Sequence, residues 1–147
     1  IVAIGPGIPG TATPFGHSGV AQGQALNAAF ALGGVPIAAL RLSFADERPR
    51  HVPVSHQTLT ALGVVTLARV LVPVPVLEAP SGDAVDAALE RAGLWERHER
   101  HSIDAGRLPD TRGIEIRTMG RTPEDDPAFF QASAAAGILA ARLAVRS

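Results

Sequence analysis

Short apolar runs alternate with longer helix-like segments along this chain, and that alternation constrains its fold more than any other feature. Such runs predict strands, and they fall at residues 1–4, 36–42, 70–76 and 114–119, with a shorter candidate near 102–103. Strands that alternate with helices favour a parallel sheet with right-handed crossovers. We therefore expect an α/β fold: a mostly parallel, Rossmann-like layered sheet of about four to five strands, with helices on both faces.

Capping residues mark the helices between these runs. The predicted helices cover about residues 18–32, 56–67, 82–92 and 127–145, and their N-cap candidates are Ser18, Ser55, Ser81 and Asp126. The length of 147 residues fits one domain, and an apolar content of 46% is enough for a buried core. The chain begins at Ile1, inside a strand-like run, so we expect one domain over residues 1–147 that is a fragment of a longer protein.

The chain has no cysteine, no tyrosine and no lysine, so all 13 of its cationic side chains are arginines. A cysteine nucleophile, thiolate metal ligation, a Schiff-base lysine and a P-loop lysine are therefore excluded. A net charge of −1 gives no electrostatic footprint for nucleic acid or for an anionic membrane. The lack of cysteine fits a reducing compartment, and we expect a cytoplasmic protein.

Ligands of open α/β sheets bind beyond the carboxyl ends of the strands. Four segments follow the predicted strands and should meet there: residues 5–18, 43–55, 73–80 and 120–126. Most of the unusual polar residues lie in the first two of these segments. The sequence therefore predicts a binding site on this edge of the sheet.

Gly5, Gly7 and Gly10 match the G-x-G-x-x-G spacing of dinucleotide-binding folds. Three prolines interrupt the loop, and Asp46 follows Gly10 by 36 residues where about 20 are expected, so a true dinucleotide fingerprint is a poor fit. A glycine loop before a helix N-terminus can still hold an anion. The side chains available for this are those of Thr11, Thr13, His17 and Ser18. A purely structural loop with capping residues explains the same segment equally well.

The segment of residues 43–56 is the richest in chemically useful side chains. Arg48 and Arg50 can make planar, bidentate contacts with a carboxylate or phosphate, and Arg121, after the predicted fourth strand, can add a third guanidinium. Ser55 can bind a ligand or only cap the helix that follows it. The competing interpretation is a solvated, charged loop.

His51 and His56 are the candidates for proton transfer, and Asp46 can orient either imidazole. Ser55 beside His56 does not make a nucleophile–base pair, because neighbours in sequence rarely face each other. His98 and His101 are three residues apart rather than the four of the H-E-x-x-H zinc motif. No metal site and no cofactor are predicted, although a nucleotide is compatible with the glycine loop.

Several motifs resemble an uncharacterised bacterial protein family of unknown function. They are G-P-G-x-x-G-T-x-T from Gly5, G-H-S-G-V-A from Gly16, the segment 43–56, S-H-Q-T-L-T-A from Ser55, T-M-G-R from Thr118, and D-P-A-F-F from Asp126. The resemblance implies that the chain is the C-terminal half of such a protein. It implies no activity, cofactor or site.

We expect a domain that binds a small anionic molecule, phosphorylated or nucleotide-like. If the protein is an enzyme, we expect it to act on that molecule. Gly5, Gly7, Gly10 and the helix start near Ser18 would hold the anion, which Arg48, Arg50 and Arg121 would clamp. The main alternative is a non-catalytic structural or oligomerisation domain, with the rest of a parent chain or a second copy as its partner. A metal-dependent hydrolase is a third option. The residues leave open whether the protein is an enzyme.

Overall fold

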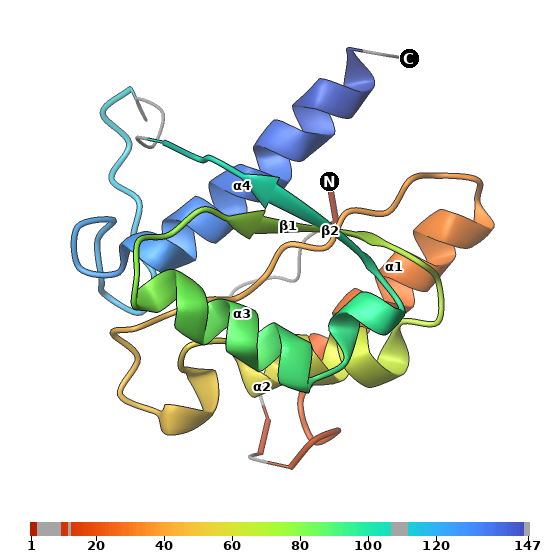
Figure 1. Ribbon diagram of the computed structural model, residues 1–147, viewed down its shortest axis with the longest axis horizontal. Helices are drawn as coiled ribbons and strands as arrows, with labels where there is room; N and C mark the ends of the chain where they lie inside the picture. The colour runs from red at the N-terminus through yellow and green to blue at the C-terminus, as the bar shows by residue number, and fades with distance from the viewer. Residues whose placement is uncertain (3–9, 12, 107–111, 146–147) are drawn as a thin grey trace.

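The computed structural model describes residues 1–2, 10–11, 13–106 and 112–145 (Figure 1). The α-helices are α1 (Ala21–Ala31), α2 (His56–Thr60), α3 (Ser81–Arg91) and α4 (Pro127–Ala144). Shorter helical turns cover Ser18–Val20, Pro49–His51 and Leu94–Glu96, and a π-helical turn, Ala61–Val65, continues α2. Two strands, β1 (Leu71–Pro75) and β2 (Glu99–Ile103), pair in parallel.

The expected Rossmann-like sheet of four to five strands is wrong, because the regular sheet among the described residues has only these two strands. The predicted strand at residues 70–76 is confirmed as β1, and the short candidate near 102–103 belongs to β2. Residues 36–42 run beside β1 but pair with its backbone through one isolated bridge, Ile37 to Leu71. Residues 114–119 do not form a strand. The first predicted strand, residues 1–4, lies partly outside the described residues.

Two prolines in β1 explain why residues 36–42 do not join the sheet. The Leu71 N–H donates to the Pro36 carbonyl, and the Leu71 carbonyl accepts from Ala38, at 3.0 and 2.9 Å. In β1 the N–H and C=O groups of every second residue point toward residues 36–42. After Leu71 the next two such residues are Pro73 and Pro75, which have no N–H. The opposite side keeps its donors at Val72, Val74 and Val76, and there β2 pairs. The ladder therefore extends in one direction only.

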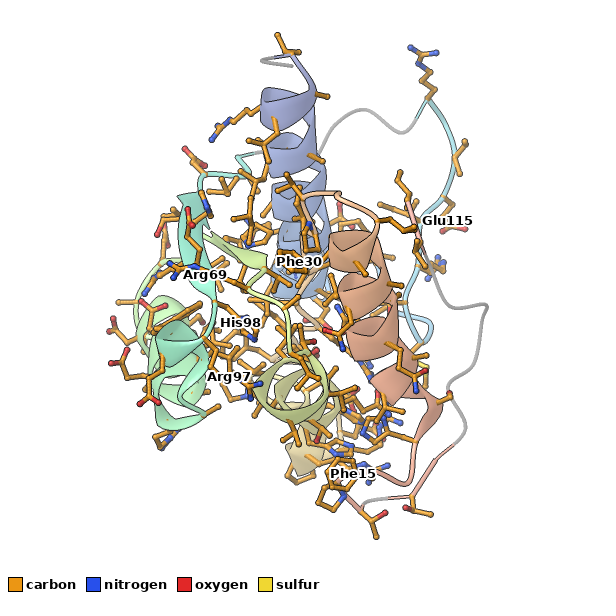
Figure 2. The ribbon with its side chains drawn as sticks, turned by 90° about the vertical axis from the view of Figure 1, so that its right-hand side faces the viewer. Phe15, Phe30, Arg69, Arg97, His98 and Glu115 are labelled. Carbon is orange, nitrogen blue, oxygen red and sulfur yellow. The ribbon has the colours of Figure 1, made fainter. Side chains whose placement is uncertain are left out.

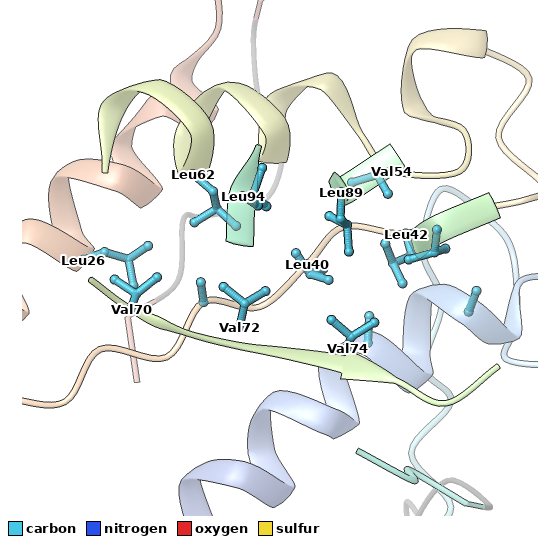
Figure 3. Packing of buried hydrophobic residues seen from close by; sticks show 14 residues of the cluster. Leu26, Leu40, Leu42, Val54, Leu62, Val70, Val72, Val74, Leu89 and Leu94 are labelled. Atoms are coloured by element: carbon cyan, nitrogen blue, oxygen red, sulfur yellow. The ribbon is translucent and has the colours of Figure 1, made fainter. Parts of the chain in front are cut away.

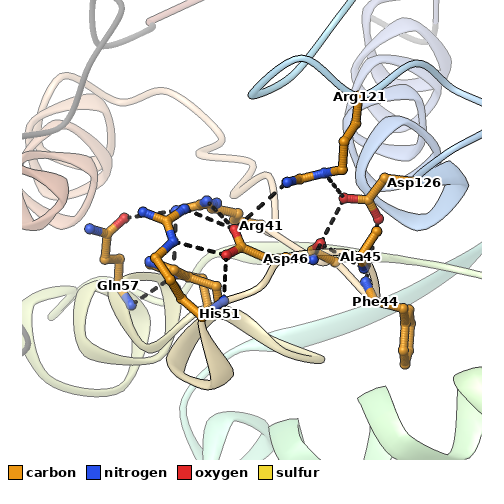
Figure 4. Close-up of polar contacts among 11 residues, drawn as sticks. Arg41, Phe44, Ala45, Asp46, His51, Gln57, Arg121 and Asp126 are labelled. Carbon is orange, nitrogen blue, oxygen red and sulfur yellow. Dashed lines mark hydrogen bonds and ion pairs between the residues drawn. The ribbon is translucent and has the colours of Figure 1, made fainter.

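Residues 118–121 form a tight turn instead of the end of a strand. Thr118 and Arg121 exchange two backbone hydrogen bonds of 2.9 Å, while Met119 and Gly120 have φ values of 50° and 82°. Positive φ at both central residues is the geometry of a type I′ turn, which glycine adopts without strain. The turn reverses the chain and sends Arg121 toward the start of α4 (Figure 4).

The main core lies on one side of β1 (Figure 3). Val72 and Val74 pack in one cluster with Leu40 from the extended segment, Leu62 from the turn after α2, and Leu89 from α3. A smaller cluster joins β2 to α4 through Ile103, Ala135 and Leu139, with Leu71 packed against it. β1 is buried on both faces because helices cover both of them.

Helices form at all four predicted positions, but the one predicted over residues 56–67 is α-helical only over His56–Thr60 and continues as the π-helical turn. The Ser55 side chain caps α2 by accepting from the Gln57 N–H, as predicted. Ser18 is not an N-cap, because it lies inside the short turn before α1, and α3 starts at Ser81 with Pro80 as its cap. The Asp126 carboxylate makes no capping bond to α4 and faces the loop after residue 42 instead. Among the described helices, none has the length and apolar character needed to cross a bilayer.

Candidate functional site

The Asp46 carboxylate lies at the centre of a group of arginines (Figure 4). Its side chain is only 2% exposed, and it accepts two hydrogen bonds of 2.9 Å from the Arg48 guanidinium and one of 3.1 Å from Arg41. Arg121 adds an ion pair at 3.6 Å. The hydrogen bonds from Arg48 are the largest cause that holds the pKa of Asp46 far below its usual range. The carboxylate is therefore charged at any physiological pH.

Asp126 is a second buried carboxylate in the same group. It accepts from the Ser43 hydroxyl at 2.7 Å, from the Phe44 N–H at 3.3 Å and from the Arg121 Nε at 3.2 Å. Arg121 therefore bridges Asp126 and Asp46, and it ties the start of α4 to a loop about 80 residues earlier in the chain. We call the group of Arg41, Asp46, Arg48, Arg121 and Asp126 the arginine–carboxylate network.

His51 lies at the edge of this network and is held in one protonation state. Its Nδ1 atom is 3.3 Å from the Arg41 guanidinium and 2.7 Å from the Ser55 hydroxyl. Arginine can only donate, so Nδ1 is an acceptor and the proton of the neutral ring is on Nε2. The Ser55 hydroxyl then donates to His51 and accepts from Gln57. Burial, helped by Arg41 and Arg48, lowers the pKa of His51 to about 4.

Three histidines lie in a row beside the network: His51, His56 and His17. Each neighbouring pair of rings has its centroids 5.2 Å apart, and the rings of His17 and His56 meet edge to face at 73°. His17 is 4% exposed, and both of its ring nitrogens are buried without a hydrogen-bond partner in the described part of the chain. The same holds for the His56 Nε2 and the Ser18 Oγ. We call His17, Ser18 and His56 the unpartnered histidine site.

Two glycines fix the position of His17. Gly10 pairs with His17 in an antiparallel bridge, and a Cβ on Gly10 would collide with that of His17. A Cβ on Gly19 would lie 2.9 Å from the His17 Nδ1. Phe15, from the turn between Gly10 and His17, lies at the α2 end of the molecule in Figure 2. The chain thus uses glycine on both sides of this ring to seat it against α2.

The structure brings several predicted site residues together and changes the role of others. Seven predicted site residues belong to, or border, the arginine–carboxylate network and the unpartnered histidine site: Asp46, Arg48, His51, His56, Ser55, Ser18 and Arg121. Arg48 and Arg121 are occupied by Asp46 and Asp126 and do not form an open clamp. Arg50 is exposed and makes no hydrogen bond or ion pair with the described residues.

The glycine loop is only partly described. Gly5 and Gly7 lie outside the described residues. Thr11 and Thr13 are exposed, and their hydroxyls bond to each other at 2.6 Å. Gly10 serves to seat His17, as described above.

Sequence reasoning missed the parts played by Arg41, Ser43 and Asp126. Arg41 was available as a signal, because it is a charged residue inside the apolar run of residues 36–42. Asp126 was interpreted as a helix cap, and nothing local distinguishes that role from a long-range contact. Ser43 carried no signal of its own.

A cavity of about 700 Å³ lies where residues 36–42, β1 and β2 end. This is the edge at which the sequence predicted a ligand. The lining includes four carboxylates, from Glu78, Asp104, Asp125 and Asp126. They make this cavity unfavourable for an anion. In the described part of the chain, no group of three or more His, Asp or Glu side chains has the arrangement of a metal site.

A protein-family profile described as "Protein of unknown function (DUF3866)" matches residues 1–137. The chain belongs to this family. The DUF3866 match includes the whole arginine–carboxylate network and all three histidines of the row, and it confirms the resemblance to an uncharacterised family. The bacterial origin and the position as a C-terminal half stay predictions. No significant match was found among curated proteins or among solved structures.

Proposed function

We propose that this domain binds a small anionic ligand, phosphorylated or nucleotide-like, where Arg50 and His56 border the arginine–carboxylate network. The observation that carries the proposal is that guanidinium groups outnumber carboxylates among the side chains paired within the network. Three guanidinium groups, from Arg41, Arg48 and Arg121, share two carboxylates. Arg50 adds a fourth that has no partner among the described residues, and its charge acts on the His56 ring. An anion would balance this excess.

In this proposal the arginine–carboxylate network positions the loop and supplies an electrostatic field, while Arg50 contacts the anion directly. Asp46 holds Arg41 and Arg48 in fixed directions, and Ser43 and Asp126 hold the loop that carries them. Such preorganised charges attract an anion without the entropic cost of ordering long side chains on binding. The acidic cavity beyond β1 and β2 is not the anion site, since its carboxylates would repel the ligand. Binding alone is proposed, and a cytoplasmic location stays a prediction.

A thermal-shift screen of the protein against inorganic phosphate, sugar phosphates and nucleotides tests this function. At a concentration of one hundred times Kd, a ligand of the native state adds about 2.7 kcal/mol of stability. Arg50→Gln is expected to weaken binding of the best ligand by about 10- to 100-fold, because a hydrogen bond to a charged group contributes about 1.5–3 kcal/mol. Arg91→Gln, the same change in the last turn of α3, is the matched control and should bind normally. Equal binding by both variants would contradict the proposal.

One observation favours self-association as a second candidate function. Helix α4 exposes Ser133, Gly137 and Ala141 at spacings of four residues, and nothing lies within 4 Å of a Cβ built on Gly137. Small residues at this spacing allow another helix to approach closely. Sedimentation equilibrium should then give twice the chain mass, and Gly137→Arg should return it to the mass of one chain. A wild-type protein that sediments as a single chain would rule out this candidate.

A further inference from the structure

The unpartnered histidine site contains more buried polar atoms than the described residues satisfy. Both ring nitrogens of His17, the Nε2 of His56 and the Oγ of Ser18 are buried without hydrogen bonds. A buried polar group left without a partner costs about 1–3 kcal/mol. Native proteins rarely carry several such groups side by side unless a water, an ion or a ligand satisfies them. Gly10 and Gly19 leave room for the His17 ring, which indicates that the position of this ring is specified by the sequence around it.

The charges around the site favour an anion over a metal ion. Apart from the burial of its ring, His56 is influenced by His17, Arg50 and Arg41, and all three lower its pKa. Beyond His56 lies His51, which faces Arg41, Arg48 and Asp46. Asp46 is already bound by its arginines, and no carboxylate is hydrogen-bonded to His17 or His56 within the described ranges. A cation would add to a positive potential here, whereas an anion would reduce it.

The angle between the rings favours a tetrahedral anion over a planar one. Ring N–H groups point in the plane of each imidazole, and the planes of His17 and His56 differ by 73°. A carboxylate accepts hydrogen bonds best in its own plane. A phosphoryl group presents oxygens in several directions and can accept from both rings and from the Ser18 hydroxyl.

We propose that His17, Ser18 and His56 bind the phosphoryl group of the ligand, and that His56 takes up one proton from solvent when the anion binds. This inference rests on the proposed function and identifies the part of the site that contacts the anion. A neutral imidazole offers one N–H, and protonation of His56 adds a further donor and a positive charge that the bound anion stabilises. No covalent bond forms or breaks.

Isothermal titration calorimetry of the full chain with sulfate and with inorganic phosphate tests the inference. Sulfate keeps its charge between pH 6 and 8, so any pH dependence of its affinity comes from the protein. We expect sulfate affinity to fall about tenfold between pH 6 and 8, the change produced by about 1.4 kcal/mol. Sulfate binding at pH 7 in two buffers of different ionisation enthalpy should show net proton uptake. Affinity independent of pH and without proton uptake would overturn the inference.

Single substitutions separate this inference from the proposed function. Ser18→Ala removes a buried hydroxyl that has no partner, so folding stability should stay the same or rise. Phosphate affinity should fall about tenfold, the effect of one lost hydrogen bond of about 1–1.5 kcal/mol. His17→Gln should lower affinity, and His56→Gln should abolish proton uptake. His101→Gln on β2 is the control and should behave as wild type. If His17→Gln does not fold, Ser18→Ala and the wild-type pH dependence still decide.

Two failures give different results. If the wild type binds neither anion and no phosphorylated ligand, the proposed function and this inference are both overturned. If Arg50→Gln weakens phosphate binding while Ser18→Ala and His17→Gln bind with wild-type affinity, only this inference fails. Ordered water would then satisfy the unpartnered histidine site.

Discussion

Asp46→Asn is expected to lower the free energy of unfolding by about 3–5 kcal/mol, the usual cost of removing one partner from a buried ion pair. The neutral amide keeps the size of the side chain but leaves Arg41, Arg48 and Arg121 directed at a group without charge. It also replaces one acceptor oxygen by a donor that opposes the Arg48 guanidinium. Urea unfolding followed by circular dichroism measures the loss.

Asp86→Asn is the matched control for this experiment. Asp86 makes a two-point contact with Arg100 at 2.8 and 2.9 Å, so its ion pair is as short as those of Asp46. Its side chain is 43% exposed, however, and exposed pairs contribute about 0–1 kcal/mol. Burial should therefore separate the two variants. Equal stabilities of Asp46→Asn and Asp86→Asn would contradict the structural role that we assign to the network.

Acidification is expected to reduce stability between about pH 6.5 and pH 4, before the Asp46 carboxylate titrates. The pKa of His51 is about 4 in the folded protein, against 6.5 as its ordinary value. In this window the unfolded chain binds more protons than the folded protein. The free energy of unfolding therefore decreases as the pH is lowered, by at most about 3 kcal/mol. The pKa of His56 is lowered too, first by burial, and its effect has the same sign. Asp46, whose pKa is also lowered, contributes stability that is lost only below its ordinary pKa of 3.8.

The test compares slopes of stability against pH rather than absolute stabilities. His51→Asn keeps an acceptor for Arg41 and Ser55 through the side-chain oxygen but cannot titrate in this range. The plot for this variant should be flatter than that of the wild type between pH 6.5 and 4. His101→Asn, the same change on β2 and outside the network, is the control. A slope for His51→Asn equal to that of the wild type would refute the assignment.

Local signals predicted the local structure of this chain well. Ser55, Asp126-Pro127 and the glycines after residues 32 and 92 mark helix ends that lie close to those observed. β1 was predicted because its apolar residues are buried on both faces. Most of β2 was missed because Glu99, Arg100 and Ser102 are exposed polar residues that carry no strand signal. Strand pairing was also missed, since it depends on which side of β1 its prolines fall.

In the candidate site, too, the local features were predicted and the long-range contacts were not. The polar segments 43–55 and 120–126 do meet, as the alternation of elements predicted, through Arg121 and Asp46. The sequence could not reveal that Arg48 and Arg121 are occupied by carboxylates, because such pairing depends on three-dimensional proximity. The same limit hid Arg41 inside a strand-like run and Asp126 behind its resemblance to a helix cap.

Pro73 and Pro75 have a further consequence for how this protein behaves in a crowded solution. A strand whose edge is uncovered is normally a template for another chain, and repeated pairing of that kind leads to aggregation. If residues 36–42 detach from β1, the side they expose has lost two of its amide donors. An incoming strand would find carbonyls there without the matching N–H groups. The prolines that keep the sheet small thus also protect the partly opened chain from polymerising through β1.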